Sequence, residues 1–159
     1  MGDSAGFRSV MGNFATGVTV VTGSAADGTP VGLTVNSVAS VSLEPRLVLI
    51  CTDKESESRG VLLETGRFGI SILRLEDRAL APRFAAEDPG ERFTGIPLRW
   101  SDSGIPFLAD ALAWLECRVW RNVDAGDHSV MIGEVLDFGG GGSGRPLVFF
   151  RGGYGTVGS

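Results

Sequence analysis

Apolar and polar residues alternate over much of this chain, which is typical of strands with one buried face. Asp27-Gly28 and the glycine-containing stretch before His128 are hairpin-turn signals between consecutive strands. Residues 46–52, "RLVLICT", are continuously apolar for most of their length, which predicts a buried strand. In total we expect strands at residues 18–24, 31–42, 46–52, 67–73, 111–123, 128–138 and 146–150, with a short one near 96–101.

Three shorter segments have the spacing of helices instead. Residues 7–15 repeat apolar side chains at the spacing of one helix face, and Gly17 ends the segment. Residues 53–66 open with polar side chains and finish as a short helix with the final glycine as C-cap. Residues 76–86 are helical, with Pro82 marking a bend or break. The apolar side chains of the first helix face are Phe7, Val10, Met11 and Phe14.

The strands follow one another mostly without an intervening helix. This order favours an antiparallel barrel or sandwich decorated by short helices over alternating strand–helix–strand units. Residues 87–111 are irregular and rich in Pro, Gly and Asp. The chain has 159 residues and no visible repeat or linker, so we expect a single domain over 1–159.

Charge and composition exclude several classes of protein. The net charge is −5 with both signs interspersed, so the basic surface of a nucleic-acid or membrane-surface protein is absent. No apolar stretch approaches the roughly 18 residues of a membrane helix, and the start lacks the pattern of a signal peptide. Cys51 and Cys117 lie in apolar runs, which indicates buried free thiols. These features predict a cytoplasmic protein with neither nucleic acid nor membrane as a partner.

Two conspicuous motifs have ordinary explanations when each is considered alone. "GGGGSG", residues 139–144, has the spacing of a dinucleotide-binding loop, yet it leads into Arg145-Pro146 and another strand instead of opening a helix. We therefore expect a hairpin loop there. His128 is the only histidine and lacks companions for a metal site or a nucleophilic triad. A structural histidine at a strand end is the simplest interpretation, and no metal site is predicted.

Two polar segments have a binding and a structural interpretation each. "DKESES", residues 53–58, lies between a buried strand and a helix, where hydroxyls, Lys54 and free backbone N–H groups would form a phosphate-binding site. A solvated, N-capped helix entrance is the alternative. "GLTVNSVAS", residues 32–40, contains amide and hydroxyl side chains within an otherwise apolar strand. Buried polar groups need partners, so this segment either faces a ligand rich in heteroatoms or forms a bulge or turn.

The order of these segments along the chain resembles the flavin reductase family, the reductase components of two-component flavin-dependent monooxygenases. The resemblance runs from about residue 7 to residue 155. Its most specific part is Thr-Val-Asn-Ser followed by Ser-x-Ser-Leu-Glu-Pro, and the Gly-Asp-His block is nearly as specific. The resemblance implies a mainly β fold, an antiparallel split β-barrel of Greek-key type with a few short peripheral helices.

The resemblance also implies roles for particular residues. His128 would lie beside the nicotinamide ring, and Arg151 with Tyr154 would help to close the nucleotide pocket. Phe84 would lie near one end of the flavin. The residues expected to line the isoalloxazine ring are Thr34, Val35, Asn36 and Ser37, and those expected to hold the ribityl chain and phosphate are Asp53, Lys54, Ser56 and Ser58.

The implied activity is that of an NAD(P)H:flavin oxidoreductase, which transfers a hydride from NADH or NADPH to FMN or FAD. Such an enzyme is typically a homodimer with flavin sites at the subunit interface, and supplies reduced flavin to a monooxygenase. Hydride transfer between two cofactors requires mainly that the protein orients both rings, which suits a chain with one histidine. A flavin-binding protein without reductase activity and a split-barrel reductase of another substrate are the alternatives. Arg46 and Gly153 depart from the family pattern, where a proline and a basic residue are usual, and Gly153 leaves NADH versus NADPH open.

Overall fold

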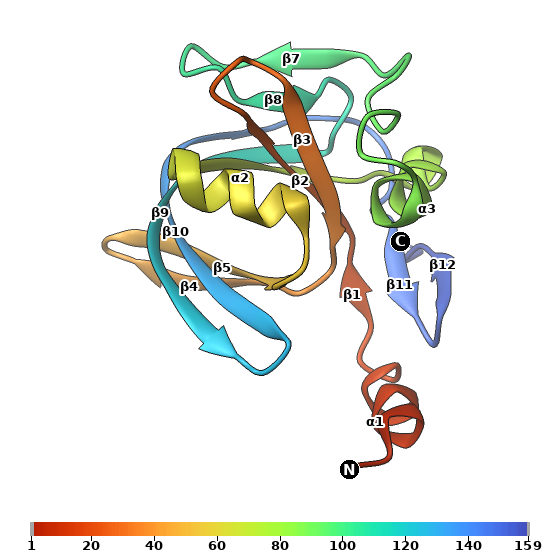
Figure 1. Ribbon diagram of the computed structural model, residues 1–159. Coiled ribbons are helices and arrows are strands. Elements are labelled where there is room, and N and C mark those ends of the chain that lie inside the picture. Colours follow the sequence, from red (N-terminus) through yellow and green to blue (C-terminus); the bar gives the residue numbers. More distant parts are fainter. Residues whose placement is uncertain (1, 159) are drawn as a thin grey trace.

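The computed structural model describes residues 2–158, which fold mainly into antiparallel strands (Figure 1). The strands form sheets of seven, three and two strands, so the mainly β class is confirmed. Their bounds are β1 (Thr16–Gly17), β2 (Thr19–Ser24), β3 (Pro30–Val35), β4 (Val38–Leu43), β5 (Arg46–Asp53), β6 (Arg67–Ile72), β7 (Leu98–Trp100), β8 (Pro106–Leu108), β9 (Ala113–Ala125), β10 (His128–Gly140), β11 (Val148–Phe150) and β12 (Gly153–Gly155).

The seven-stranded sheet has the order β3-β2-β6-β9-β10-β5-β4, with β3 and β4 at its edges. The predicted hairpins join β2 to β3 and β9 to β10, and the positive φ of 87° at Gly28 and 69° at Gly126 suits glycine in these turns. Register shifts interrupt the pairing of β10 with β9 after Ile132 and after Val135. Such bulges bend strands, and they contribute to the curled shape of the sheet in Figure 1.

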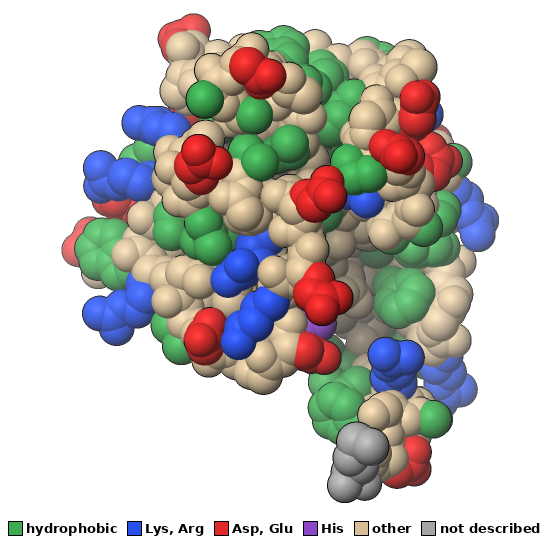
Figure 2. All heavy atoms as spheres, in the orientation of Figure 1, with side chains coloured by type: hydrophobic (Ala, Val, Ile, Leu, Met, Phe, Trp, Pro, Cys, Tyr) green, Lys and Arg blue, Asp and Glu red, His purple; other side chains and the backbone are tan. Residues whose placement is uncertain are grey.

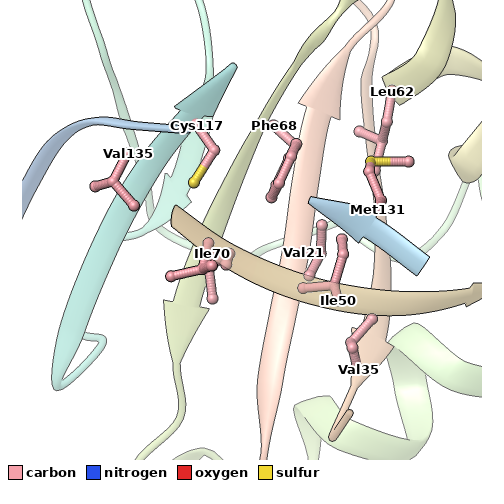
Figure 3. Close-up of a cluster of buried hydrophobic side chains, with 10 residues drawn as sticks. Val21, Val35, Ile50, Leu62, Phe68, Ile70, Cys117, Met131 and Val135 are labelled. Atoms are coloured by element: carbon pink, nitrogen blue, oxygen red, sulfur yellow. The ribbon is translucent and has the colours of Figure 1, made fainter. Parts of the chain in front are cut away.

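One hydrophobic cluster fills the inner face of the curled sheet (Figure 3). Phe68 of β6 is fully buried at its centre, and Gly133 of β10 makes room for its ring, since a Cβ there would approach Phe68 Cζ to 2.5 Å. The side chains labelled in Figure 3 are Val21, Val35, Ile50, Leu62, Phe68, Ile70, Cys117, Met131 and Val135. A second cluster, with Phe84 and Leu147 buried in it, lies between the small helices and the C-terminal strands.

The helices are α1 (Ser4–Met11), α2 (Glu57–Thr65), the 3-10 turn η1 (Leu75–Asp77) and α3 (Leu80–Ala86). The predicted C-cap of α2 is confirmed, because Gly66 is left-handed and its N–H donates to Leu62 O. The predicted bounds 7–15 were wrong for α1. The Asp3 carboxylate accepts from the Gly6 N–H at 2.8 Å and starts this helix earlier, while the Asn13 amide donates to the Ser9 and Val10 carbonyls and ends it.

The single strand predicted at residues 31–42 is two strands, β3 and β4, separated at Asn36-Ser37. There the chain leaves its pairing with β2 and joins β5 instead. Ser37 secures the change, since its hydroxyl donates to Cys51 O at 3.1 Å and its carbonyl accepts from Cys51 N at 3.2 Å. The alternation of the sequence continues across the break, so periodicity alone did not reveal it.

The helix predicted at 76–86 is also divided, into η1 and α3. Pro82 neither bends nor breaks α3, because it lies in the first turn, where its missing N–H is not needed. In the glycine-rich segment, β10 continues to Gly140 and a loop leads on to β11, with no helix after it in the described chain. The predicted hairpin loop was wrong, because β10 pairs with β9 and β5, whereas β11 pairs with β1 and β12 in another sheet.

The cysteines are unpaired, as expected, but differ in exposure. Cys117 is fully buried, and burial raises the pKa of its thiol to about 12. Cys51 is only half-buried, because its side chain lies on the outer face of β5. Within residues 2–158, no helix is long and apolar enough to cross a membrane, and no group of three or more potential ligands could hold a metal ion.

Candidate functional site

A cavity of about 490 Å³ opens between the last residues of β3 and β5, the start of α2 and the end of α3. Its volume is within the range of small-molecule sites. In Figure 2 the purple imidazole lies at the edge of a hollow, beside acidic side chains. The cavity brings together most of the predicted site residues, namely Thr34, Val35, Asn36, Ser37, Asp53, Ser56, Ser58, Phe84 and His128.

The break between β3 and β4 supplies one wall of the cavity. Thr34 Oγ1 donates to Ala81 O at 2.5 Å, and Asn36 Nδ2 donates to Thr16 Oγ1 at 3.3 Å. The two interpretations of this polar segment are therefore both realised. The side chains hold an irregular backbone, and the same residues line a cavity. The Asn36 amide is exposed and retains further hydrogen-bonding capacity toward a ligand.

The entrance of α2 forms the opposite wall. Ser56 caps the helix by accepting from the Arg59 N–H at 3.3 Å, and Asp53 Oδ1 accepts from the Glu55 N–H at 2.8 Å. Ser58 is buried and donates to Gly32 O at 3.2 Å, so its hydroxyl proton is already used within the chain. The capped-entrance interpretation holds for these contacts, while the N-terminus of α2 still faces the cavity.

Lys54 differs from its neighbours in this segment, because it does not line the cavity. Its Nζ lies 3.5 Å from Asp124 Oδ1 on β9. The Lys54 ammonium, which was predicted to bind the phosphate, therefore lies at the β9–β10 hairpin and not in the cavity.

Arg92 is a cavity residue that the sequence analysis missed. Within residues 2–158, it is the only Lys or Arg that lines the cavity. Its guanidinium is anchored by donation from Nη1 to Gly32 O at 2.7 Å and from Nε to Glu87 O at 3.0 Å. Arg92 lies in the irregular stretch 87–111, which has no periodic pattern to indicate where its side chains point, and no signal marked it.

His128 reaches the cavity from the first residue of β10, directly opposite Asp53 of β5. Its Nδ1 lies 2.7 Å from Asp127 Oδ1, and this hydrogen bond holds the pKa of Asp127 below its ordinary value. The turn that carries both residues is fixed to the α2 entrance, because the Lys54 N–H donates to Asp127 O at 3.1 Å.

Arg151 and Tyr154 lie outside the cavity in the single chain. Arg151 holds α1, since its backbone N–H and its Nε donate to Gly12 O and to Asn13 Oδ1, both at 2.9 Å. The Tyr154 ring packs on Phe149 with centroids 5.4 Å apart. The structure therefore does not bring these two predicted residues together with the others.

An apolar groove of about 950 Å³ runs between α1 and the outer face of the sheet. Asn36 and Ser37 line both the groove and the cavity, so the two are continuous at the β3–β4 break. The remaining lining is largely apolar and includes Met11, Phe14, Val38, Leu49 and Phe149.

A curled antiparallel sheet with a ligand-sized cavity at a broken edge strand and a helix entrance is typical of split barrels with a small-molecule site. Within that class the match is specific. The family model described as "Flavin reductase like domain" matches residues 11–158, and the chain belongs to this family.

Individual relatives agree with this assignment. A probable flavin reductase of Rhizobium meliloti is 40% identical over 97% of this chain, but the chain spans only 49% of that protein. The crystal structure of nitrilotriacetate monooxygenase component B from Mycobacterium thermoresistibile matches with a TM-score of 0.93 and 39% identity, over 98% of this chain and 87% of the other. The NADH:FAD oxidoreductase of Streptomyces globisporus matches with a TM-score of 0.92 and 35% identity, over 99% and 95%. The predicted split barrel is thereby confirmed.

Proposed function

We propose that this chain binds FMN or FAD in the cavity and transfers a hydride to it from a nicotinamide nucleotide. The observation that carries the proposal is the meeting of the β3–β4 break, the α2 entrance and His128 around one cavity, in a chain of the flavin reductase family. The flavin, when bound, supplies the hydride-accepting chemistry. The protein contributes binding, orientation and exclusion of water.

The cavity residues fit a flavin nucleotide. The exposed Asn36 amide and the backbone of the β3–β4 break offer donors and acceptors for the polar edge of a ring system. Arg92 and the N-terminus of α2 offer positive charge and N–H groups for a phosphate. The Thr52 hydroxyl, which is buried at the cavity, has no hydrogen-bond partner within the described chain and suits a polar ligand.

His128 is assigned to the nicotinamide side of the cavity. The imidazole is 45% exposed at the rim, where a second nucleotide has access to it. It orients the nicotinamide amide by a hydrogen bond, and the reaction requires no further acid or base from the chain.

NADH is the proposed donor in preference to NADPH. A 2′-phosphate favours an arginine partner, yet Gly153 stands where the family usually has a basic residue, and the Arg151 side chain is bound to Asn13. The Streptomyces globisporus relative, whose name specifies NADH and FAD, agrees with this choice.

The proposed unit is a homodimer, because two apolar surfaces of the single chain lack cover. Phe7 on α1 is 68% exposed, and Phe14, just after the end of this helix, is 71% exposed. The run in β5 is apolar on both faces, but only the inner side chains are buried, and Leu47 and Leu49 on the outer face are half-buried. A second copy that covers α1, the groove and the outer face of β5 would bury these side chains.

Such a dimer would also complete the site. Because the groove meets the cavity at Asn36 and Ser37, a partner subunit seated in the groove would border the bound flavin. The position of Arg151 beside α1 suits a contact with a nucleotide held across that interface, and Tyr154 packs on Phe149, which lines the groove.

Reduced flavin is the product, and its proposed destination is a flavin-dependent oxygenase. By name, the Mycobacterium thermoresistibile relative is a component of a monooxygenase, and a relative from Mycobacterium tuberculosis that is 41% identical is the reductase subunit of a flavin-dependent monooxygenase. The cavity opens to solvent at its rim (Figure 2), which suits release of the flavin. Free thiols at Cys51 and Cys117 and the use of NADH support a location in the cytoplasm.

The test is nicotinamide oxidation with the purified chain in the presence and absence of added flavin. We expect NADH oxidation that depends on FMN or FAD. Flavin binding without any oxidation of NADH or NADPH would instead identify a flavin-binding protein without reductase activity. Oxidation only with a quinone or another acceptor would identify a reductase of a different substrate.

A further inference from the structure

The turn between β9 and β10 holds a carboxylate against the only imidazole of the chain. Asp127 Oδ1 is 2.7 Å from Nδ1 of His128. The turn is not free to move independently, since Lys54 N–H donates to Asp127 O at 3.1 Å and Arg59 Nε donates to Ser129 Oγ at 2.9 Å. Both contacts tie the hairpin to the α2 entrance, which is the other wall of the cavity.

We propose that Asp127 is a positioning residue that keeps a proton on Nδ1 of His128 and so leaves Nε2 as the ring nitrogen available to the nicotinamide nucleotide. The proposal deepens the proposed function and rests on it for the identity of the ligand. A carboxylate only accepts hydrogen bonds, so the 2.7 Å contact requires Nδ1 to carry the proton. In the neutral imidazole, Nε2 is then an acceptor for the carboxamide N–H of nicotinamide, and in the charged form it is a donor for the carboxamide oxygen.

Other charged groups near His128 are already engaged or lie farther away. Asp53, its partner across the sheet, accepts from the Glu55 N–H. Lys54 and Asp124 pair with each other at 3.5 Å. On α1, Arg8 contributes to the low pKa of Asp127 through its charge, after the larger effect of the His128 hydrogen bond. Glu55, Glu57 and Arg92 line the same cavity without an ion pair to the imidazole among the described residues.

The Asp127 carboxylate is 94% exposed, but the hydrogen-bond geometry still decides which ring nitrogen of His128 carries the proton. A merely structural role for Asp127 would leave the tautomer unchanged when the side chain is replaced. The two roles are therefore separable by experiment.

The first test is ¹⁵N NMR of the imidazole in the full-length chain, where a single histidine gives one unambiguous pair of ring-nitrogen signals. In the wild type we expect the neutral imidazole to be the Nδ1–H tautomer. Asp127→Ala should lose this preference and populate the Nε2–H tautomer. Asp127→Asn retains an acceptor oxygen without the charge, so it should keep the Nδ1–H tautomer.

Asp102→Asn is the matched control, because Asp102 is an exposed carboxylate in the turn between β7 and β8, at the opposite end of the molecule from the hairpin (Figure 1). It removes the same charge far from the imidazole and should leave the tautomer of His128 unchanged. An Nε2–H tautomer in the wild type, or identical tautomers in wild type and Asp127→Ala, would overturn the proposal. This measurement needs neither cofactor, so it stands even where the reductase activity fails.

The second test is steady-state kinetics with the same variants. Asp127→Ala should raise the NADH KM by about 3-fold, the effect of one lost exposed contact, and leave the flavin KM unchanged. An equal rise in both KM values, or no change in either, contradicts a role on the nicotinamide side. No oxidation of nicotinamide by the wild type would instead contradict the proposed function, whatever the NMR result.

Discussion

The imidazole of His128 is the one side chain at the rim that combines exposure with an oriented ring nitrogen. Replacing it by Ala should raise the NADH KM or lower kcat by about 10-fold, the effect of one well-placed hydrogen bond, while flavin affinity changes by less than about 2-fold. Steady-state kinetics and flavin fluorescence titration measure the two quantities. A loss of flavin affinity as large as the loss of turnover would place His128 on the flavin instead.

Arg92 is expected to recognise the flavin phosphate. Since it is the only lysine or arginine of the described chain that lines the cavity, Arg92→Ala should raise the KM for FMN by about 10-fold or more, the range of a lost charge-assisted hydrogen bond. Riboflavin lacks the phosphate, so its KM should stay within about 2-fold. Arg78→Ala, at an exposed position between η1 and α3, is the control for lost charge. An equal rise in the KM for FMN and for riboflavin would show instead that Arg92 only stabilises its loop and does not bind the phosphate.

The two cysteines should differ in reactivity. Cys51 lines the cavity, so a thiol reagent should modify it in the native protein and FMN should protect it. Cys117 should react only on unfolding, because burial raises the pKa of its thiol to about 12 and excludes the reagent. The folded state holds this proton more tightly, so the stabilisation is present below the unfolded pKa of about 8.5 and is lost as the pH rises toward about 12. Rapid modification of both thiols in the native protein at pH 8 contradicts this account.

Among the secondary-structure elements, α2 offers a matched pair of glycines. Gly60 lies within the helix with open space around it, so Gly60→Ala should stabilise the protein by about 0.5–1 kcal/mol. Gly66 is left-handed, with φ 70°, so Gly66→Ala should destabilise it by about 1 kcal/mol. Urea unfolding measures both free energies. The same sign for the two substitutions would contradict the assigned end of α2.

Elements with a strong local signal were predictable from the sequence. The β2–β3 and β9–β10 hairpins follow from glycine turn signals, and the end of α2 follows from Gly66. The β3–β4 break was not predictable, because it depends on hydrogen bonds between Ser37 and Cys51, which are 14 residues apart in the chain. The start of α1 was missed because the Asp3 cap precedes the apolar pattern.

The site was predictable in part. The resemblance to the flavin reductase family placed Thr34, on β3, and His128, on β10, at one site, and the structure brings both to the cavity. Arg92 could not be placed there, since nothing local orders the loop that carries it. The distance of Arg151 from the cavity is a property of the assembled molecule, because its segment lies beside α1 and the groove.

For the molecule as a whole, the exposed apolar face of α1 is expected to be a subunit interface. Phe14→Glu would place a charge in the groove and should weaken self-association by at least about 10-fold, with a parallel loss of flavin affinity. Sedimentation velocity over a concentration series measures the change. Trp100→Glu, on β7 and remote from α1 in Figure 1, is the control and should leave association unchanged. A wild-type monomer at all concentrations would contradict the dimer.

Stopped-flow oxidation of NADH and NADPH with FMN, FAD and riboflavin in turn tests the central claim most directly. The account predicts that NADH is oxidised only when a flavin is present, faster than NADPH, and with a lower KM for the phosphorylated flavins than for riboflavin. Absence of flavin-dependent oxidation with either nicotinamide would contradict it.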